Sequence, residues 1–290
     1  YEILRCLVGS EMCIRDRGRP HEGTPFRMNR IAVRFAYHGD GFSGSQIQPG
    51  ARTVEGEMRS ALLKVCHLAD GELDLRIASR TDKGVNALGN VAVFNTGFND
   101  PEALLRALNA VSDGIFYTGY AWVDEGFNPR HATSREYVYV LPSDGLDIDM
   151  AKRCASLFVG EHDFVRFCRP DGKPTKVTVD SLDIVEGDGC VILTYRARYF
   201  LWNMVRRTAA AIAEVASGHS SLADVAGALE GDECNFGIAR ADALTLTEVG
   251  YDGLEFIPCD SHVLSGKVGE QAFSARLRLG FYSSLLHSDG

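Results

Sequence analysis

One carboxylate stands between two cations in a loop of mostly small residues, positions 80–90 with the sequence RTDKGVNALGN. Asp82 has Arg80 and Lys83 beside it, and neighbouring cations favour the charged form of a carboxylate. An ionised carboxylate that is held in place can act as a nucleophile or as a general base. The alternative is an aspartate in a surface turn, where such residues are common, and the local sequence by itself favours that alternative.

Two tyrosines could take part in the same chemistry. Tyr137 and Tyr139 are two residues apart on a predicted strand, so their rings point to the same face of the sheet. A phenol there can stack on a nucleobase or accept a proton. The commoner role for such a pair is packing in a hydrophobic core, and the sequence leaves both roles open.

Two arginines stand near the start of a predicted helix. Arg206 and Arg207 lie near the start of the helix predicted at residues 202–218, where the helix dipole disfavours positive charge. A nearby anion, either a carboxylate or a phosphate, would offset that cost. The alternative, which local chemistry favours, is that both side chains are exposed with their alkyl stems along the helix surface.

A glycine-rich segment follows the first predicted strand. Residues 39–44, GDGFSG, match the spacing G-x-G-x-x-G of dinucleotide-binding loops. That function requires a helix to begin at the loop, because the helix N-terminus binds the pyrophosphate. Here Pro49 and Gly50 follow closely and indicate a continuing loop. We therefore expect a turn, and a nicotinamide-dependent oxidoreductase is disfavoured.

The elements that must position these groups alternate between strands and helices. In the first half we expect strands at residues 30–37, 75–79, 91–95 and 115–123 and helices at 53–66 and 101–111. In the second half we expect strands at 136–141, 177–186 and 190–196 and helices at 147–157, 202–218 and from 221 onward. The short turn 187–189 favours antiparallel pairing. The pattern predicts an α+β fold rather than a doubly wound parallel sheet.

The composition limits the class of protein. The chain has 290 residues, a formal net charge of −9 and 45% hydrophobic residues, which is enough for the core of about two domains. No apolar run reaches the ~18 residues that a membrane helix needs. The eight cysteines are irregularly spaced without a C-x-x-C pair, so we expect reduced thiols in a cytoplasmic protein rather than a zinc ribbon or a disulfide framework.

The first residues have a different character from the rest. Residues 7–16, LVGSEMCIRD, are the translation of a transposase-type sequencing adapter, so we expect residues 1–27 to be a non-native leader and Met28 the natural start. This leader carries five arginines and four acidic residues, so the acidic balance belongs to the remainder. We divide that remainder into an N-terminal half over 28–124, a C-terminal half over 125–258 and a polar, weakly periodic tail over 259–290.

Four blocks of the chain, in order, resemble the tRNA pseudouridine synthase A family over about residues 30–255. The blocks are RTDxGV with a later glycine at residues 80–89, FNxRxA followed by RxYxY at residues 127–139, GExDF at residues 160–164 and FLxNMVR at residues 200–206. The chain departs from residues common in the family at His38, Ser45, Lys83 and Asn86.

The resemblance implies that Asp82 is the catalytic aspartate, Tyr137 the active-site tyrosine and Arg206 the arginine that pairs with the aspartate. It implies that Arg80 helps to flip the target base out of the RNA. The implied fold has two pseudo-related halves around a continuous, mainly antiparallel sheet, with the site in a central cleft. The resemblance also implies a homodimer that acts on tRNA and needs no metal or organic cofactor.

The reaction that the resemblance implies is isomerisation of uridine to pseudouridine, at about positions 38–40 of the tRNA anticodon arm. The base must leave its stack, and uracil is then detached from C1′, rotated and rejoined through C5. Asp82 would attack C1′ or the uracil ring, or act as a base, while Arg206 holds it through a bidentate pair. A tyrosine or a water would take the C5 proton.

Because tRNA is a polyanion, we expect the basic side chains of this acidic chain to gather around the cleft and the acidic ones to lie on the outer faces. The RNA-binding candidates are Arg80, Lys83, Arg130, Arg135 and Arg207. The alternative function is that of an RNA-binding relative without catalysis, and the joint presence of Asp82, Tyr137 and Arg206 argues against it.

Overall fold

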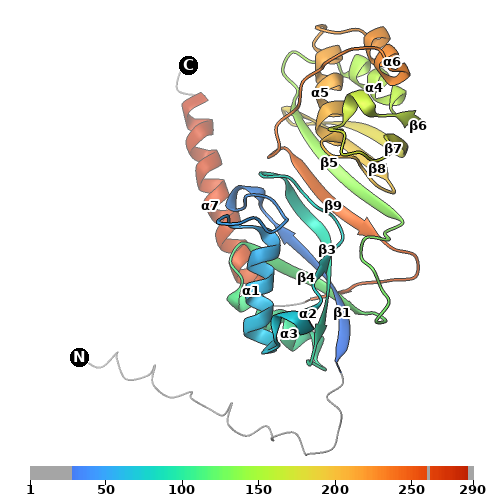
Figure 1. The fold of residues 1–290 in the computed structure, drawn as a ribbon. Coiled ribbons are helices and arrows are strands. Elements are labelled where there is room, and N and C mark those ends of the chain that lie inside the picture. Colours follow the sequence, from blue (N-terminus) through green and yellow to red (C-terminus); the bar gives the residue numbers. More distant parts are fainter. Residues whose placement is uncertain (1–27, 260–261, 287–290) are drawn as a thin grey trace, which may run out of the picture.

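The computed structural model describes residues 28–259 and 262–286, which form one large sheet with helices packed against it (Figure 1). The predicted leader, residues 1–27, lies outside the described residues. The strands are β1 (Asn29–Tyr37), β2 (Arg76–Ile77), β3 (Asn86–Thr96), β4 (Ile115–Trp122), β5 (Ser134–Pro142), β6 (Gly160–Asp163), β7 (Lys176–Gly187), β8 (Cys190–Ala197), β9 (Leu244–Gly250) and β10 (Ile257–Pro258). The helices are α1 (Val54–Cys66), α2 (Asp70–Leu73), α3 (Pro101–Val111), α4 (Ile148–Leu157), α5 (Met204–Ala216), α6 (Leu222–Glu230) and α7 (His262–Leu286), with short 3-10 turns η1 (Gly39–Gly41) and η2 (Val165–Phe167).

The ten strands form a single sheet in the order β10-β4-β1-β3-β9-β5-β8-β7-β6, with β2 paired to β3. Every pair of neighbouring strands in the described chain is antiparallel except β3 and β9, which run parallel. This confirms the α+β class and the continuous, mainly antiparallel sheet. The parallel pair joins the strands of the first half to those of the second.

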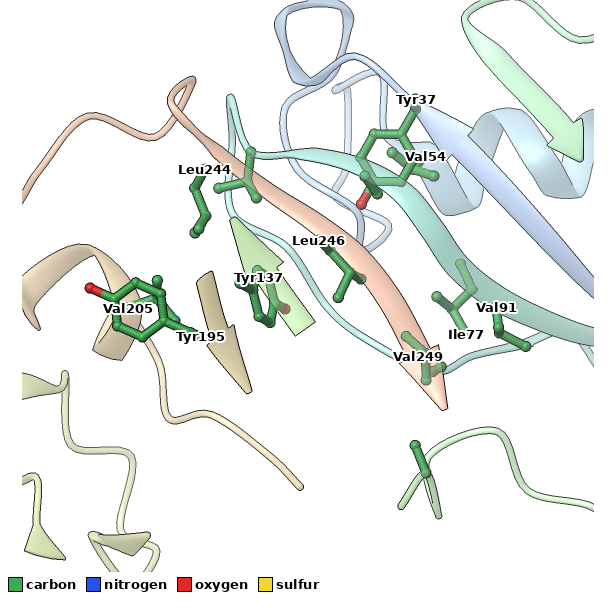
Figure 2. Close-up of a cluster of buried hydrophobic side chains, with 14 of the residues drawn as sticks. Tyr37, Val54, Ile77, Val91, Tyr137, Tyr195, Val205, Leu244, Leu246 and Val249 are labelled. Atoms are coloured by element: carbon green, nitrogen blue, oxygen red, sulfur yellow. The ribbon is translucent and has the colours of Figure 1, made fainter. Parts of the chain in front are cut away.

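A row of buried side chains crosses the sheet at this junction. Tyr195 pairs with Tyr137, Tyr137 with Leu246, Leu246 with Ala87 and Ala87 with Tyr37, on five successive strands. Directly paired residues share a face of the sheet, and all five are at most 8% exposed. Figure 2 shows Leu246 between Tyr137 and Tyr37. One continuous hydrophobic core therefore runs through both halves.

Capping residues set the starts of several helices. Thr53 Oγ1 accepts the Gly56 N–H at 3.3 Å, Asp100 accepts the Ala103 N–H at 3.0 Å, and Asp147 accepts the Met150 N–H at 3.0 Å. Ser221 and Asp224 form a reciprocal capping box at the start of α6. The β7–β8 hairpin closes through Asp188 and Gly189, and Gly189 has a φ of 64°. These signals are local, so the sequence predicts these boundaries within a few residues.

The described residues contain three strands and two helices that are not among the expected elements: β6, β9, β10, α2 and α7. Of these, β6, β10 and α2 are short, with four, two and four residues, whereas β9 has seven residues and takes its partners from both halves of the chain. The tail contains α7, which its weak periodicity does not indicate. Exposed apolar side chains lie on several sides of this helix, among them Val268, Phe273 and Leu279. They form no single stripe, so the usual helical pattern is missing.

Helix α7 is fixed near its start. Lys267 Nζ donates to the carbonyl oxygens of Asn109 and of Ser112, the second at 2.9 Å, at the C-terminal end of α3. A cation at that end also complements the helix dipole. Among the described residues, no helix combines the length and apolar character needed to span a membrane.

Candidate active site

The loop that carries Asp82 is fixed by hydrogen bonds of Thr81 to Tyr37 and Ser45. The Thr81 Oγ1 lies 2.7 Å from the hydroxyl of Tyr37, inside the core. The Thr81 N–H donates to Ser45 Oγ at 2.8 Å, and the Thr81 carbonyl oxygen accepts the Ser45 N–H at 3.0 Å. Ser45 and Thr81 are both buried. The residue immediately before Asp82 therefore has a single defined position.

The glycine-rich segment supports this loop. An added Cβ on Gly39 would lie 2.4 Å from the backbone carbon and oxygen of Gly84, so only glycine fits there. Asn86 connects the two segments further, because its Oδ1 accepts the Gly39 N–H at 2.8 Å and its Nδ2 donates to the Asp242 carbonyl oxygen at 2.8 Å. A 3-10 turn and loop follow Gly39, and α1 begins only at Val54. The expected absence of a helix at the glycines is confirmed, and the segment is a support rather than a dinucleotide loop.

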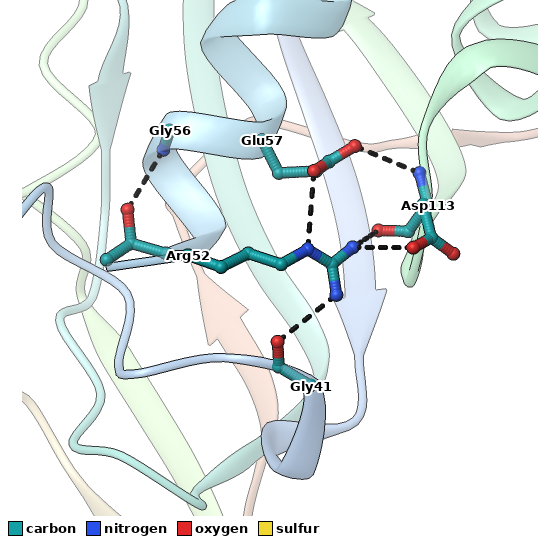
Figure 3. A network of polar contacts seen from close by, with 6 residues as sticks. Gly41, Arg52, Gly56, Glu57 and Asp113 are labelled. Carbon is teal, nitrogen blue, oxygen red and sulfur yellow. Dashed lines mark hydrogen bonds and ion pairs between the residues drawn. The ribbon is translucent and has the colours of Figure 1, made fainter. Parts of the chain in front are cut away.

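Arg52 anchors the far side of the same segment (Figure 3). Its guanidinium donates to the Gly41 carbonyl oxygen at 3.1 Å and to Asp113, and it forms an ion pair with Glu57 of α1 at 3.5 Å. The guanidinium also lies over the ring of Phe42, 4.6 Å from its centroid. These contacts hold the glycine segment against α1 and the α3–β4 turn.

The carboxylate of Asp82 is held by two residues from the start of α5. The indole Nε1–H of Trp202 donates to Oδ1 at 3.1 Å, and Arg206 Nη1 lies 3.8 Å from Oδ2. The side chain of Asp82 is 37% exposed and that of Arg206 17%. Arg206 lies near Asp82, as expected, but the expected bidentate pair is wrong. Their shortest N–O distance, 3.8 Å, is longer than a hydrogen bond, and Arg206 Nε donates instead to the carbonyl oxygen of Ala239 at 2.8 Å.

Tyr137 lies in the buried row beside this carboxylate. Burial raises its pKa far above the usual range for a phenol, and the nearby charge of Asp82 contributes in the same direction. Its ring packs edge-to-face on Phe200, with centroids 5.2 Å apart. No other described residue forms a hydrogen bond with its hydroxyl. The structure thus brings together Asp82, Tyr137 and Arg206 from both halves of the chain.

Comparison with known proteins identifies the family of the chain. A family model described as tRNA pseudouridine synthase matches residues 154–252. The tRNA pseudouridine synthase A of Pyrococcus abyssi is 38% identical over 232 residues, covering 78% of this chain and 86% of that protein. That of Thermococcus onnurineus is 34% identical over 264 residues, covering 89% of this chain and 98% of that protein. The chain belongs to the tRNA pseudouridine synthase A family.

Membership in the tRNA pseudouridine synthase A family confirms the resemblance found in the four sequence blocks, and it makes the chain a member of an isomerase family. Among solved structures, an archaeal box H/ACA sRNP Nop10–Cbf5 complex matches at a TM-score of 0.36 with 12% identity. That match covers 75% of this chain and 47% of that chain.

Three of the basic residues suggested by the tRNA pseudouridine synthase A blocks are exposed beside the site. Arg80, Lys83 and Arg130 have no carboxylate partner within the part of the chain that the structure describes. Arg80 and Arg130 line a cavity of ≈ 100 Å³ together with Ser45, Gln46 and other residues. Two exposed arginines nearby were missed by sequence reasoning, namely Arg169, beside Trp202, and Arg198, beside Arg135.

Arg135 is 9% exposed and points inward. Its guanidinium donates to Ser79 Oγ at 2.9 Å and to the carbonyl oxygens of Ala78, Arg130 and Arg198. Burial lowers its pKa from the usual value. Because Ser79 and Ala78 precede Asp82 closely, the Arg135 side chain ties β5 to the loop before Asp82.

Arg207 is half-buried on the first turn of α5, and its Nε is buried without a partner among the described residues. Its positive charge partly offsets the rise that burial causes in the pKa of Cys168. Of these two arginines, Arg206 is the one that contacts Asp82 in the described part of the chain.

The main residue that sequence reasoning missed is Trp202. It occupies the variable position of FLxNMVR, so the family motif gives it no role. Its exposure of 44% is unusual for so large an aromatic residue. Asn203, the next residue, has a left-handed φ of 64°, which asparagine tolerates. This turn brings Trp202 and Arg206 to the same carboxylate. Within the described residues, no group of three metal-ligating side chains comes together.

Proposed function

We propose that this chain converts uridine to pseudouridine in tRNA, with Asp82 as the catalytic carboxylate. The observation that carries the proposal is the placement of Asp82 between Trp202 and Arg206, beside the buried Tyr137. The C1′–N1 bond of the nucleoside breaks and a C1′–C5 bond forms. C5 loses its proton and N1 gains one, so the product is an isomer of the substrate. Asp82 attacks C1′ or the uracil ring, or assists departure of the base.

Arg80 is proposed to fill the space that the flipped uridine leaves. Flipping costs a few kcal/mol of stacking and pairing, and a guanidinium can occupy the gap and contact phosphate. Arg80 is exposed, without an ion-pair partner among the described residues, and two residues from Asp82. Arg130 across the shared cavity and Lys83 in the same loop supply further positive charge for the RNA backbone.

Tyr137 is proposed to act as a neutral phenol. A phenol with the usual pKa of 10.0 is already neutral near neutral pH, and burial raises the pKa of Tyr137 further, so the phenolate is not populated. The ring then packs against the uracil and orients it, and the C5 proton passes to water. Arg135, whose partners are all internal, is proposed to position the segment before Asp82 rather than to bind RNA directly.

The finer assignments rest on the family. We propose that the target uridines lie at positions 38–40 of the anticodon arm, that the enzyme is a cytoplasmic homodimer, and that it uses no metal or organic cofactor. The halves 28–124 and 125–258 would contribute Asp82 and the pair Tyr137 and Arg206, respectively.

Mapping of pseudouridine in an unmodified tRNA transcript treated with the protein tests the site assignment. Pseudouridine confined to positions 38–40 is expected, and modification only outside the anticodon arm would contradict it. An RNA-binding relative without catalysis would bind the same transcript and leave every uridine unchanged.

A further inference from the structure

Trp202 and Arg206 each contact one oxygen of the Asp82 carboxylate, Trp202 from the turn before α5 and Arg206 from the first turn of the helix. Trp202 precedes the N-cap residue of α5, and Arg206 is the third residue of the helix. The indole Nε1–H can only donate, so its bond to Asp82 Oδ1 requires an acceptor there. With Arg206 Nη1 at 3.8 Å from Oδ2, the contact at 3.1 Å from Trp202 is the shorter of the two.

Arg169 fixes the indole in turn. Its guanidinium lies over the Trp202 ring, 4.0 Å from the centroid, and its backbone N–H donates to the Trp202 carbonyl oxygen at 2.8 Å. A cation over an indole face is an attractive contact even when it is exposed. Both the main chain and the ring of Trp202 are therefore held by one residue from the segment before β7.

Without this support, the Asp82 side chain would be held through its contact with Arg206 alone. It lies in a loop, it is 37% exposed, and the 3.8 Å contact with Arg206 constrains one oxygen only weakly. A carboxylate that attacks carbon must be aimed, because small displacements of a reacting group are costly in rate. The indole supplies a rigid donor at the second oxygen.

We propose that Trp202 is a positioning residue for Asp82, and that Arg169 holds its indole in place. This inference rests on the proposed function and deepens it. We expect Trp202 to affect the rate of the reaction in the bound complex and not the affinity for tRNA. The competing role for an exposed tryptophan in an RNA-modifying enzyme is a stacking platform for a base, which would act on affinity.

The variant Trp202→Phe separates the two roles, because phenylalanine keeps a stacking face and loses the N–H. We expect the single-turnover rate at saturating tRNA to fall about 10-fold or more, which corresponds to loss of one hydrogen bond to a charged group, with an unchanged Kd for tRNA. The matched control is Trp122→Phe, which changes the other tryptophan of the chain. Trp122 is 43% exposed, close to the 44% of Trp202, and its replacement should leave the single-turnover rate and the Kd unchanged. An unchanged single-turnover rate, or a higher Kd as the only effect, would overturn the proposal.

The hydrogen bond itself is tested without activity. The chain has two tryptophans, so a ¹⁵N-labelled sample gives two indole Nε1–H signals, which Trp122→Phe assigns. We expect Asp82→Ala to shift the Trp202 signal and to leave the Trp122 signal in place. A Trp202 signal that does not respond would overturn the proposed contact. Failure of the wild-type protein to modify any tRNA would instead refute the proposed function, and the two failures are therefore distinct.

Arg169→Leu provides a second route that leaves Trp202 in place. We expect the Trp202 signal to broaden or shift and the single-turnover rate to fall, with partial recovery in Arg169→Lys, which keeps the cation over the ring. Equal activity of Arg169→Leu and the wild type would contradict the role of Arg169.

Discussion

Arg206 links two groups: its shortest contact with Asp82 joins Nη1 and Oδ2 at 3.8 Å, and its Nε donates to the Ala239 carbonyl oxygen at 2.8 Å. The Ala239 N–H donates back to the Arg206 carbonyl oxygen at 3.1 Å. The guanidinium thus joins Asp82 of the first half to the segment that leads into β9. This contact accounts for a cation in the first turn of α5, since the carboxylate offsets the unfavourable helix dipole.

Arg206→Lys is expected to lower kcat about 10-fold or more, because an ammonium on a flexible stem cannot hold the carboxylate and the carbonyl oxygen together. Multiple-turnover kinetics with tRNA measure the effect, and a thermal unfolding midpoint close to that of the wild type shows that the fold is kept. A variant with undiminished kcat would show that the charge alone is sufficient.

Gly39→Ala is expected to reduce both activity and stability. The new Cβ would lie 2.4 Å from the backbone of Gly84, so the loop that carries Asp82 must shift, at a cost of about 1–3 kcal/mol. The matched control in the same 3-10 turn is Gly41→Ala, whose Cβ meets only the flexible end of Arg52 at 3.3 Å. Denaturant unfolding and kcat measure the difference. Equal behaviour of the two variants would mean that the close approach does not position the loop.

The buried tyrosines predict a loss of stability at high pH. Burial raises the pKa of Tyr37 from 10.0 to about 12, and those of Tyr117, Tyr137, Tyr195 and Tyr251 rise further. The folded state therefore keeps these protons where the unfolded state releases them, so the stabilisation is complete below pH 10 and is lost as the pH rises towards 12 and beyond. Absorbance at 295 nm should show a group of tyrosines that titrates only on unfolding. Titration of all tyrosines together near pH 10 in the folded protein would contradict this.

Arg80→Ala is expected to weaken tRNA binding and to reduce the slope of log K against log salt by about one, if its guanidinium meets a phosphate. The control is Arg106→Ala on α3, an exposed arginine that pairs with Glu102 in the preceding turn of the same helix. Filter binding at several salt concentrations gives both slopes. An equal slope for Arg80→Ala and the wild type would show that Arg80 does not contact a phosphate.

The elements with strong local signals are those that the sequence predicts well. Helix α3 occupies the predicted residues 101–111, because Pro101 stands at its first position and Asp100 caps it. The strand predicted at 75–79 is shorter, since the chain turns after Ile77 into the loop that holds Ser79 against Asn90 and Arg135. Strand β9 depends on partners from distant parts of the chain, and no local pattern specifies them.

The same distinction applies to the site. Asp82, Tyr137 and Arg206 are recognisable because they belong to sequence blocks of a known family. Trp202 contacts Asp82 across 120 positions of sequence, and an exposed tryptophan before a helix carries no signal of that contact. Arg135 was expected to bind RNA because it is a cation in a family block, and only the folded chain shows that its partners are backbone and side-chain oxygens inside the protein.

Release of tritium from tRNA labelled at C5 of uridine, measured for the wild type and for Asp82→Asn, tests the central claim most directly. Asparagine keeps the shape of the side chain and an acceptor for Trp202 but carries no charge. The wild type is predicted to release tritium, and Asp82→Asn to bind tRNA equally well and release none above background. Tritium release by Asp82→Asn at the wild-type rate would contradict the assignment of Asp82 as the catalytic carboxylate.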